Sequence, residues 1–306
     1  MSLRILFMGT SEFAVPILKS INDSSHEILS VYTQPPSQKS RGQKIIESPI
    51  HKLSKKLKHN VRCPQNLKNQ DELQYIQKLS PDVVVVVAYG QIISKEILNI
   101  PNILFLNVHA SLLPKWRGAA PIQRSIMEMD DETGITIMKI VPKLDSGPYI
   151  LQEKIKIDKS ENQEQLSFKL SAIGAKLILK ALDKIETGDK KFIEQDENKV
   201  SYAKKIDKQE SKINWNTPAE NLVSKINGLS PYPGAWFEHN KNRIKIIKAI
   251  NVNENGKIGE VIDENLTIGC IKNSIRVLKI QKEGKKILST KEFSLGYKIK
   301  KGEILN

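Results

Sequence analysis

The sequence has few of the features that mark a secreted, membrane-spanning or zinc-binding protein. Its two cysteines, Cys63 and Cys270, are far apart and neither belongs to a Cys-X-X-Cys pair, so no disulfide framework or zinc site is predicted. No apolar run approaches the roughly 20 residues of a membrane-spanning helix. The first twenty residues contain Gly9 and Pro16 and predict a strand and a helix rather than a signal peptide. We therefore expect a cytoplasmic protein without membrane association.

Acidic residues are scarce relative to basic ones. The chain has 48 Lys and Arg against 34 Asp and Glu, which gives a formal charge of +14. Residues 39–62 contain eight basic residues and one acid, Glu47, and residues 210–306 contain 17 basic and 10 acidic residues, so each region has a surplus of seven. Two separate basic regions predict contact with a long polyanion. A generally basic surface without such a partner is the alternative.

Strand and helix patterns alternate through the first two-thirds of the chain. The five valines at 83–87 are typical of a central parallel strand that is buried on both faces. Residues 4–9, 27–34 and 103–109 predict further strands, and residues 166–188 predict a long amphipathic helix that Gly188 ends. The fold class is therefore α/β, with a Rossmann-like, open and mostly parallel sheet that has helices on both faces.

The composition changes after residue 189. Residues 190–209 are polar and charged and predict a linker. Short apolar runs then recur about every ten residues, including 243–252, 256–263 and the final "FSLGYKI" at 293–299, which predicts a small C-terminal antiparallel β-barrel of the OB-like kind. We therefore expect an α/β domain at 1–189, a linker at 190–209 and a β domain at 210–306.

The predicted strand at 103–109 ends in an unusual pair of polar residues, Asn107 and His109. Because side chains two apart on a strand share a face, both should point to the same side at the edge where open α/β sheets bind ligands. An amide can donate to a developing oxyanion, and an imidazole can move a proton near neutral pH. Asp145 follows another buried strand, and we expect it at the same edge, where it can tune His109.

Other interpretations of these residues remain open. Asn and Asp are common in turns, and a histidine at a strand end is often structural. Ser111 precedes Leu-Leu-Pro rather than lying in a Gly-X-Ser-X-Gly elbow, so we expect direct transfer without a covalent enzyme intermediate. No metal-ligand motif is present. "FMGTSEF" has one glycine where a dinucleotide-binding motif needs three, so NAD binding is not expected.

Two long motifs, "NVHASLLPKWRGAAPI" at 107–122 and "ETGITIMKIVPKLDSGPYI" at 132–150, resemble the 10-formyltetrahydrofolate-dependent formyltransferases. The likeness extends over nearly the whole chain, through "FMGTSEFAVPIL", "DVVVVVAYGQII" and "LSPYPGAWFE". It implies that Asn107, His109 and Asp145 form the catalytic centre. Asn107 and protonated His109 would stabilise the oxyanion, and Asp145 would hold and polarise His109. The group that takes the amine proton is left open.

The resemblance also implies the substrates and the residues that bind them. The formyl donor would be 10-formyltetrahydrofolate, the acceptor would be the methionine α-amino group of an initiator methionyl-tRNA, and no metal would take part. We expect a monomer. The residues implied to bind folate are Val87, Ala88, Tyr89, Gly90, Gln91, Ile92, Ser111, Leu112, Leu113, Pro114 and Val141. The residues proposed to bind tRNA are Arg41, Gly42, Lys44, Arg243, Lys245, Lys248 and Arg276.

Two alternatives to a tRNA substrate follow from the same residues. A formyltransferase for a small amine, such as glycinamide ribonucleotide or a nucleotide-linked amino sugar, would share the Asn-His-Asp centre but would not need the two basic regions. A non-catalytic RNA-binding protein would need the basic regions but not the centre. A formyl-transfer assay separates the three.

Overall fold

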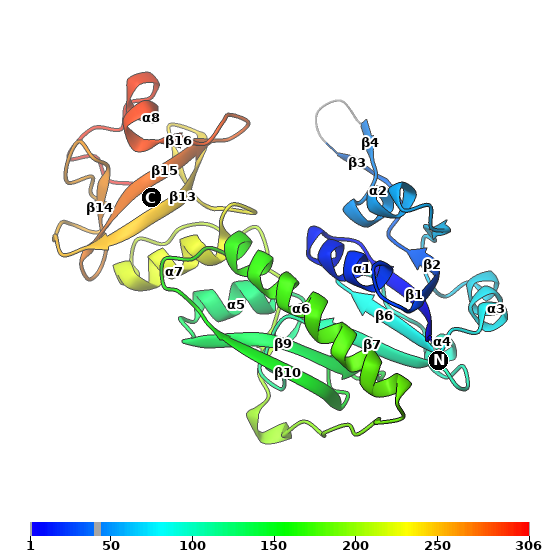
Figure 1. Ribbon diagram of the computed structural model, residues 1–306. Coiled ribbons are helices and arrows are strands. Elements are labelled where there is room, and N and C mark those ends of the chain that lie inside the picture. The colour runs from blue at the N-terminus through cyan, green and yellow to red at the C-terminus, as the bar shows by residue number, and fades with distance from the viewer. Residues whose placement is uncertain (1, 40–43, 306) are drawn as a thin grey trace. The chain divides into compact units, whose positions relative to one another are not determined.

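The computed structural model describes residues 2–39 and 44–305 (Figure 1). The elements as far as residue 186 are β1 (Arg4–Gly9), η1 (Glu12–Ala14), α1 (Val15–Asn22), β2 (Glu27–Tyr32), β3 (Ser37–Lys39), β4 (Lys44–Ile46), α2 (Pro49–Lys56), β5 (Val61–Arg62), α3 (Gln70–Leu79), β6 (Val83–Val87), α4 (Lys95–Leu98), β7 (Leu104–His109), β8 (Arg117–Gly118), α5 (Pro121–Met127), β9 (Glu132–Lys139), β10 (Tyr149–Lys156) and α6 (Gln163–Glu186). The remaining elements are η2 (Glu197–Lys199), β11 (Tyr202–Ala203), α7 (Ala219–Leu229), β12 (Ala235–His239), β13 (Asn242–Val252), β14 (Thr267–Gly269), β15 (Ser274–Lys282), β16 (Leu288–Ser289) and α8 (Thr290–Gly296).

A seven-stranded sheet organises the first part of the chain, in the order β10-β9-β7-β6-β1-β2-β5. The strands from β5 to β7 are parallel, whereas β9 runs antiparallel to β7. The chain passes from β1 to β2 on one side and later to β6 on the other, which creates a switch point between β1 and β6. Open α/β sheets bind their ligands beyond the carboxyl ends of strands at such a point. The predicted α/β class is confirmed.

Helices cover both faces of this sheet. On one face, Leu6 and Met8 of β1 form a buried cluster with Ile76 of α3 and Ile97 of α4. On the other face, α6 packs closely against β7 and α1, because a side chain at Gly174 would lie 3.1 Å from Val108 and 3.3 Å from Ile17. The five valines of β6 are buried, as a strand between two helical layers requires.

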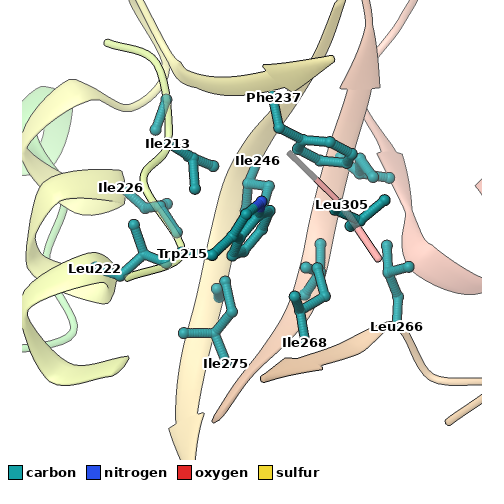
Figure 2. Packing of buried hydrophobic residues seen from close by; sticks show 14 of the residues in the cluster. Ile213, Trp215, Leu222, Ile226, Phe237, Ile246, Leu266, Ile268, Ile275 and Leu305 are labelled. Atoms are coloured by element: carbon teal, nitrogen blue, oxygen red, sulfur yellow. The ribbon is translucent and has the colours of Figure 1, made fainter. Parts of the chain in front are cut away.

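The C-terminal part has an antiparallel sheet of its own, in the order β12-β13-β15-β14, with β16 beside β15. Its core contains Trp215, Phe237 and, from α7, Leu222 and Ile226 (Figure 2). The rings of Trp215 and Phe237 pack edge to face, with their centres 5.6 Å apart. Each aromatic ring buries a large apolar area, so this cluster is a main source of stability for the C-terminal sheet.

Contacts divide the chain into two compact units. The first contains residues 1–118, 134–155 and 167–202, and the second contains residues 119–133, 156–166 and 203–306. The second unit thus includes two segments that lie before residue 189, where the sequence-based boundary was drawn. One of them is the segment with α5, which packs against α7.

Several local predictions were wrong. Residues 293–299, expected as a strand, lie mainly in α8, whose start is fixed by a capping box between Ser289 and Glu292. The run at 256–263 forms isolated bridges rather than a strand, and β10 was not anticipated. The loop after β2 contains the short β3–β4 hairpin.

Within the described ranges, 2–39 and 44–305, the helices are all too short or too polar to span a membrane.

Candidate active site

The carboxyl end of β7 carries Asn107 and His109. Phe105, two residues before Asn107, belongs to the buried cluster beneath α3 and α4, so all three side chains lie on that face of the sheet. Asn107 is paired with Val86 of β6 and is half-buried. Its side-chain amide makes no hydrogen bond to any residue within the described ranges. The structure thus presents an amide donor at the predicted edge.

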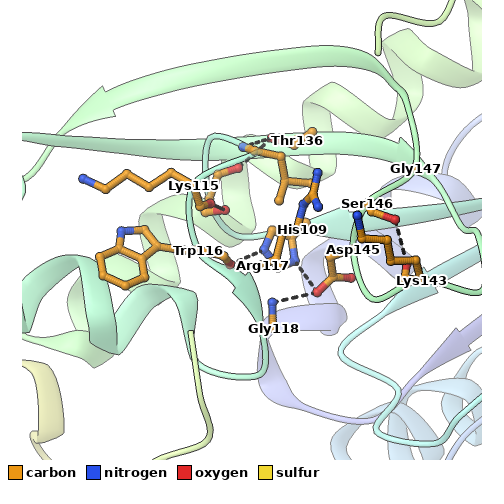
Figure 3. A network of polar contacts seen from close by, with 12 residues as sticks. His109, Lys115, Trp116, Arg117, Gly118, Thr136, Lys143, Asp145, Ser146 and Gly147 are labelled. Atoms are coloured by element: carbon orange, nitrogen blue, oxygen red, sulfur yellow. Dashed lines mark hydrogen bonds and ion pairs between the residues drawn. The ribbon is translucent and has the colours of Figure 1, made fainter. Parts of the chain in front are cut away.

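The ring of His109 is buried, with 5% of the residue exposed, and is held from two sides (Figure 3). Its Nε2 lies 2.9 Å from the carbonyl oxygen of Trp116. Because a carbonyl oxygen can only accept, Nε2 must carry the hydrogen. The other nitrogen, Nδ1, lies 3.8 Å from Oδ2 of Asp145. In the neutral ring, Nδ1 is therefore the proton acceptor, and it faces a carboxylate.

Asp145 reaches His109 by a different route from the one expected. Since β9 is antiparallel to β7, its last residue, Lys139, lies beside Leu106 rather than beyond His109. The connection 140–148 then carries Asp145 to His109, where Oδ2 accepts a hydrogen bond from the backbone N–H of Gly118 at 2.8 Å. The expected proximity is present, but a connecting loop rather than the end of a parallel strand produces it.

A network of side chains supports this connection. Arg117 is completely buried, and its guanidinium donates to Oε1 of Gln195 at 2.9 Å and to Oε1 of Glu197 at 2.7 Å. Gln195 donates to the carbonyl oxygens of Asp145 and Gly147, and Lys143 donates to Glu197. The hydrogen bonds from Arg117 and Lys143 lower the pKa of Glu197 to about 2. Gln195 and Glu197 were not predicted as site residues, because they lie in the segment 190–209 that was predicted as a linker.

The segment predicted to bind folate after β6 is tied to the neighbouring strand ends. Oγ1 of Thr10, after β1, donates to the carbonyl oxygen of Tyr89 at 2.7 Å, and Nε2 of Gln34, after β2, donates to the carbonyl oxygen of Gly90 at 2.9 Å. Val87 and Tyr89 are buried, Ala88 and Gly90 are exposed and Gln91 is half-buried. Ile92 is 85% exposed and so offers an apolar surface at this edge of the sheet.

The Ser-Leu-Leu-Pro segment is largely part of the protein interior. Ser111 is completely buried and donates to the carbonyl oxygen of Lys115 at 2.6 Å, and Leu113 is buried with its N–H bound to Oγ1 of Thr136. Leu112 and Pro114 are half-buried, as is Val141 at the start of the loop that carries Asp145. Ser111 therefore holds the segment in place in this structure, and the half-buried members are the ones available to a ligand.

The residues proposed to bind tRNA differ in their surroundings. Arg41 and Gly42 lie outside the described residues, and Lys44 begins β4. Arg276 is already paired with two acids, Glu254 at 2.6 Å and Asp263 at 3.7 Å.

On β13, the guanidinium of Arg243 lies 4.1 Å from the ring centre of Trp236 and is 3.8 Å from Glu283, and Lys245 is paired with Gln281 of β15. Lys248 is exposed and lies directly opposite the exposed Lys279. Neither of these two lysines forms an ion pair within the described ranges. Like charges in a cross-strand pair are destabilising unless an anion meets them.

One further cluster has the composition of a metal site. It is formed by His26, Asp183 and Glu186, among the residues that the structure describes. It contains none of the residues predicted to act in catalysis, and Asp183 is exposed.

An amide donor, an imidazole and a carboxylate lie at the carboxyl edge of an open α/β sheet, where such sheets bind ligands, and groups of these kinds are able to carry out acid–base chemistry. Comparison with known proteins then gives the family. The chain belongs to the formyl transferase family: the profile for formyl transferase matches residues 3–182, and the profile for the formyl transferase C-terminal domain matches residues 205–298.

The chain is also similar to individual proteins along its whole length. It is 49% identical over 304 residues to the methionyl-tRNA formyltransferase of Pelagibacter ubique, covering 99% of this chain and 98% of that protein. It is 42% identical over 307 residues to the methionyl-tRNA formyltransferase of Chelativorans sp., covering 99% of each. The crystal structure of HypX from Aquifex aeolicus with tetrahydrofolic acid has the same fold, with a TM-score of 0.66 and 17% identity over all of this chain and 51% of that one.

Proposed function

We propose that the protein transfers a formyl group from 10-formyltetrahydrofolate to the α-amino group of methionyl initiator tRNA, as a monomer in the cytoplasm. The observation that carries this proposal is the full-length similarity to methionyl-tRNA formyltransferases, at 49% and 42% identity. It is supported by the Asn107, His109 and Asp145 arrangement and by the presence of both family domains.

Asn107 stabilises the negative charge that develops on the formyl oxygen when the amine attacks. Its amide has no hydrogen-bond partner within the described ranges and is half-buried at the carboxyl end of β7. A donor held on a strand needs no reorganisation during the reaction, which is why such groups lower the activation barrier effectively.

His109 accepts the amine proton at Nδ1, and Asp145 stabilises the imidazolium that results. The hydrogen bond from Nε2 to the carbonyl oxygen of Trp116 keeps the hydrogen of the neutral ring on Nε2. The carboxylate of Asp145, 3.8 Å from Nδ1, then faces the new positive charge. Once protonated, the ring also adds positive charge beside the oxyanion that Asn107 binds. When the tetrahedral intermediate collapses, the bond between the formyl carbon and N10 breaks, and the proton on His109 passes to N10, so that tetrahydrofolate leaves as a neutral amine.

The residues at the sheet edge fit a folate donor. Two large apolar side chains are exposed on the segments expected to contact it, Ile92 at 85% and Leu144 at 60%. Such side chains can pack against an aromatic ring system. The 10-formyltetrahydrofolate supplies the formyl carbon that the amine attacks, and the segment Val87–Ile92, fixed by Thr10 and Gln34, holds one side of the donor.

The tRNA acceptor is proposed to bind the basic strands of the C-terminal sheet. Lys248 and Lys279 face one another across β13 and β15 without an acid within the described ranges, and Lys245 and Arg243 lie on the same strand β13. A phosphate backbone would neutralise this group. Arg276 contributes less in this proposal, because Glu254 and Asp263 already meet its charge.

The test is formyl transfer from 10-formyltetrahydrofolate to methionyl initiator tRNA, with glycinamide ribonucleotide and a nucleotide-linked amino sugar as parallel acceptors. We expect transfer to the tRNA and none to the small amines. Transfer to a small amine alone would overturn the proposed acceptor and keep the proposed chemistry. No transfer to any acceptor would overturn both.

A further inference from the structure

We propose that Arg117 and Gln195 are positioning residues for the reaction: through two hydrogen bonds, Gln195 holds the loop that carries Asp145 against His109, and Arg117 holds Gln195. This inference rests on the proposed function, because it concerns how Asp145 is placed for its role there. Neither residue faces a substrate, since Arg117 is 0% and Gln195 is 8% exposed.

The orientation of the Gln195 amide follows from its partners. A guanidinium can only donate, and backbone carbonyls can only accept. Gln195 must therefore turn its oxygen to Nε of Arg117 and its nitrogen to the loop. That nitrogen donates to the carbonyl oxygen of Asp145 at 2.9 Å and to that of Gly147 at 2.7 Å. One side chain thus fixes the backbone at Asp145 and two residues beyond it.

A second connection holds the same loop on its other side. Glu197 accepts from Arg117 through Oε1 and from Lys143 through Oε2, at 2.7 and 2.9 Å. Lys143 lies two residues before Asp145. Arg117 is therefore connected to the loop at two places, and the next residue, Gly118, binds the Asp145 carboxylate directly.

The backbone of Asp145 needs this support. Its φ angle is 44°, in the left-handed region that residues other than glycine adopt at an energetic cost. Such a conformation persists where surrounding contacts fix it. Gly147 completes the turn, because a side chain there would clash with the carbonyl oxygen of Lys139.

The arrangement around Arg117 is poorly explained by stability alone. Its Nη1 is buried and makes no hydrogen bond within the described ranges. A buried guanidinium with an unsatisfied nitrogen is costly, because that N–H group has lost its contact with water and gained no partner in exchange. Positioning of the Asp145 loop accounts for a charged residue at this place.

The test uses Gln195→Glu in the full-length protein, in the wild-type background and in the Asp145→Asn background. Glutamate keeps the size of the side chain and the contact with Arg117, but it turns a carboxylate oxygen toward two carbonyl oxygens. We expect kcat for formyl transfer to fall roughly 10- to 100-fold in the wild-type background, the range for residues that orient a catalytic group, and about twofold or less in the Asp145→Asn background.

A loss by the same factor in both backgrounds, or no loss in the wild-type background, would overturn the inference. Glu72→Gln is the matched control, because it makes the reverse exchange beside Arg62 and Tyr32, away from the loop. Its kcat should remain within about twofold of wild type if the effect at Gln195 is specific.

A second readout needs no activity and so separates this inference from the proposed function. The N–H of Gly118 is bound by the Asp145 carboxylate, and its hydrogen exchange reports whether that carboxylate is in place. Gln195→Glu should accelerate exchange at Gly118, and Glu72→Gln should not. Unchanged exchange in Gln195→Glu would contradict the inference even if no acceptor is formylated.

Discussion

Charged side chains are arranged in opposite ways around Asp145 and at the cross-strand pair of Lys248 on β13 and Lys279 on β15. Around Asp145, charged groups are paired: Arg117 and Lys143 share Glu197, and Gly118 binds the Asp145 carboxylate. On the two strands, Lys248 and Lys279 stand opposite one another and form no ion pair within the described ranges. The first arrangement fixes the position of the loop that carries Asp145. The second leaves two positive charges available to an anionic partner.

This difference suggests a division of work. Catalysis depends on groups held within tenths of an ångström, and paired charges can hold a loop in such a fixed position. Binding a long polyanion depends on basic side chains that are exposed and are not paired with acidic residues of the protein itself. Substitutions around Asp145 should therefore alter kcat, and substitutions of Lys248 and Lys279 should alter the affinity for tRNA.

The largest expected effect comes from Asn107→Ala or His109→Ala. Removing an oxyanion donor or a proton acceptor should lower kcat by roughly 100-fold or more, while the Kd for tRNA changes by less than about twofold. Steady-state kinetics and a filter-binding assay measure the two quantities. Near-normal kcat in either variant would exclude that residue from the mechanism. Weakened tRNA binding would contradict the proposed separation between residues that act in catalysis and residues that bind tRNA.

The second effect is on salt dependence. If the C-terminal sheet and residues 39–62 bind phosphates, log Kd for initiator tRNA should rise with log salt with a slope of roughly 3 or more, because each phosphate contact releases counterions. Titrations between about 50 and 200 mM salt measure the slope. Asn107→Ala should keep the same slope. A flat response would show that the exposed charges do not bind the nucleic acid.

The third effect concerns the pH dependence of stability. Hydrogen bonds from Arg117 and Lys143 lower the pKa of Glu197 from 4.5 to about 2. A lowered carboxylate pKa stabilises the fold above the unfolded-state pKa, and this contribution is lost as the pH falls through the folded-state pKa. The Tm difference between wild type and Glu197→Gln should be constant above about pH 5 and shrink between about pH 4.5 and 2. A difference that stays constant down to pH 3 would contradict the Arg117 and Lys143 pairing.

The smallest effect compares the half-buried thiol of Cys63 in the first unit with the buried thiol of Cys270 in the core of the second unit. Burial raises the pKa of both thiols, that of Cys270 to about 11, and Cys270 is buried whereas Cys63 is only half-buried. Iodoacetamide at pH 8 should modify Cys63 slowly, and Cys270 only after unfolding. Mass spectrometry of the labelled peptides measures both rates, and rapid labelling of Cys270 in the folded protein would show that this core is open.

The sequence predicted those strands and candidate site residues for which one local pattern dominates. Five valines give β6, and the spacing of Asn107 and His109 places both on one face. It did not predict that a connecting loop places Asp145 beside His109. The direction of β9 depends on its pairing with β7 and not on the residues of β9 alone. Gln195 and Glu197 carry no local pattern, and their importance comes from a buried arginine nearly eighty residues earlier.

The error at the C-terminus has a readable cause. "FSLGYKI" alternates like a strand, but Ser289 and Glu292, which both precede this run, form a capping box that begins a helix. The Ser-X-X-Glu capping signal is present in the sequence, but the alternation of apolar and polar residues in "FSLGYKI" led to the prediction of a strand. Strand β10 was missed because polar and apolar residues do not alternate along its sequence, YILQEKIK.

The most direct test of the division is the double variant Lys248→Gln and Lys279→Gln, measured for kcat, KM for methionyl initiator tRNA and Tm. The matched control is Lys291→Gln, which removes one exposed positive charge on α8. Because the two lysines face one another without an acid in the described structure, their removal should leave Tm unchanged or slightly higher. KM should rise roughly tenfold with kcat unchanged, as for the loss of about two phosphate contacts. An unchanged KM, or a fall in kcat with KM intact, would contradict the account.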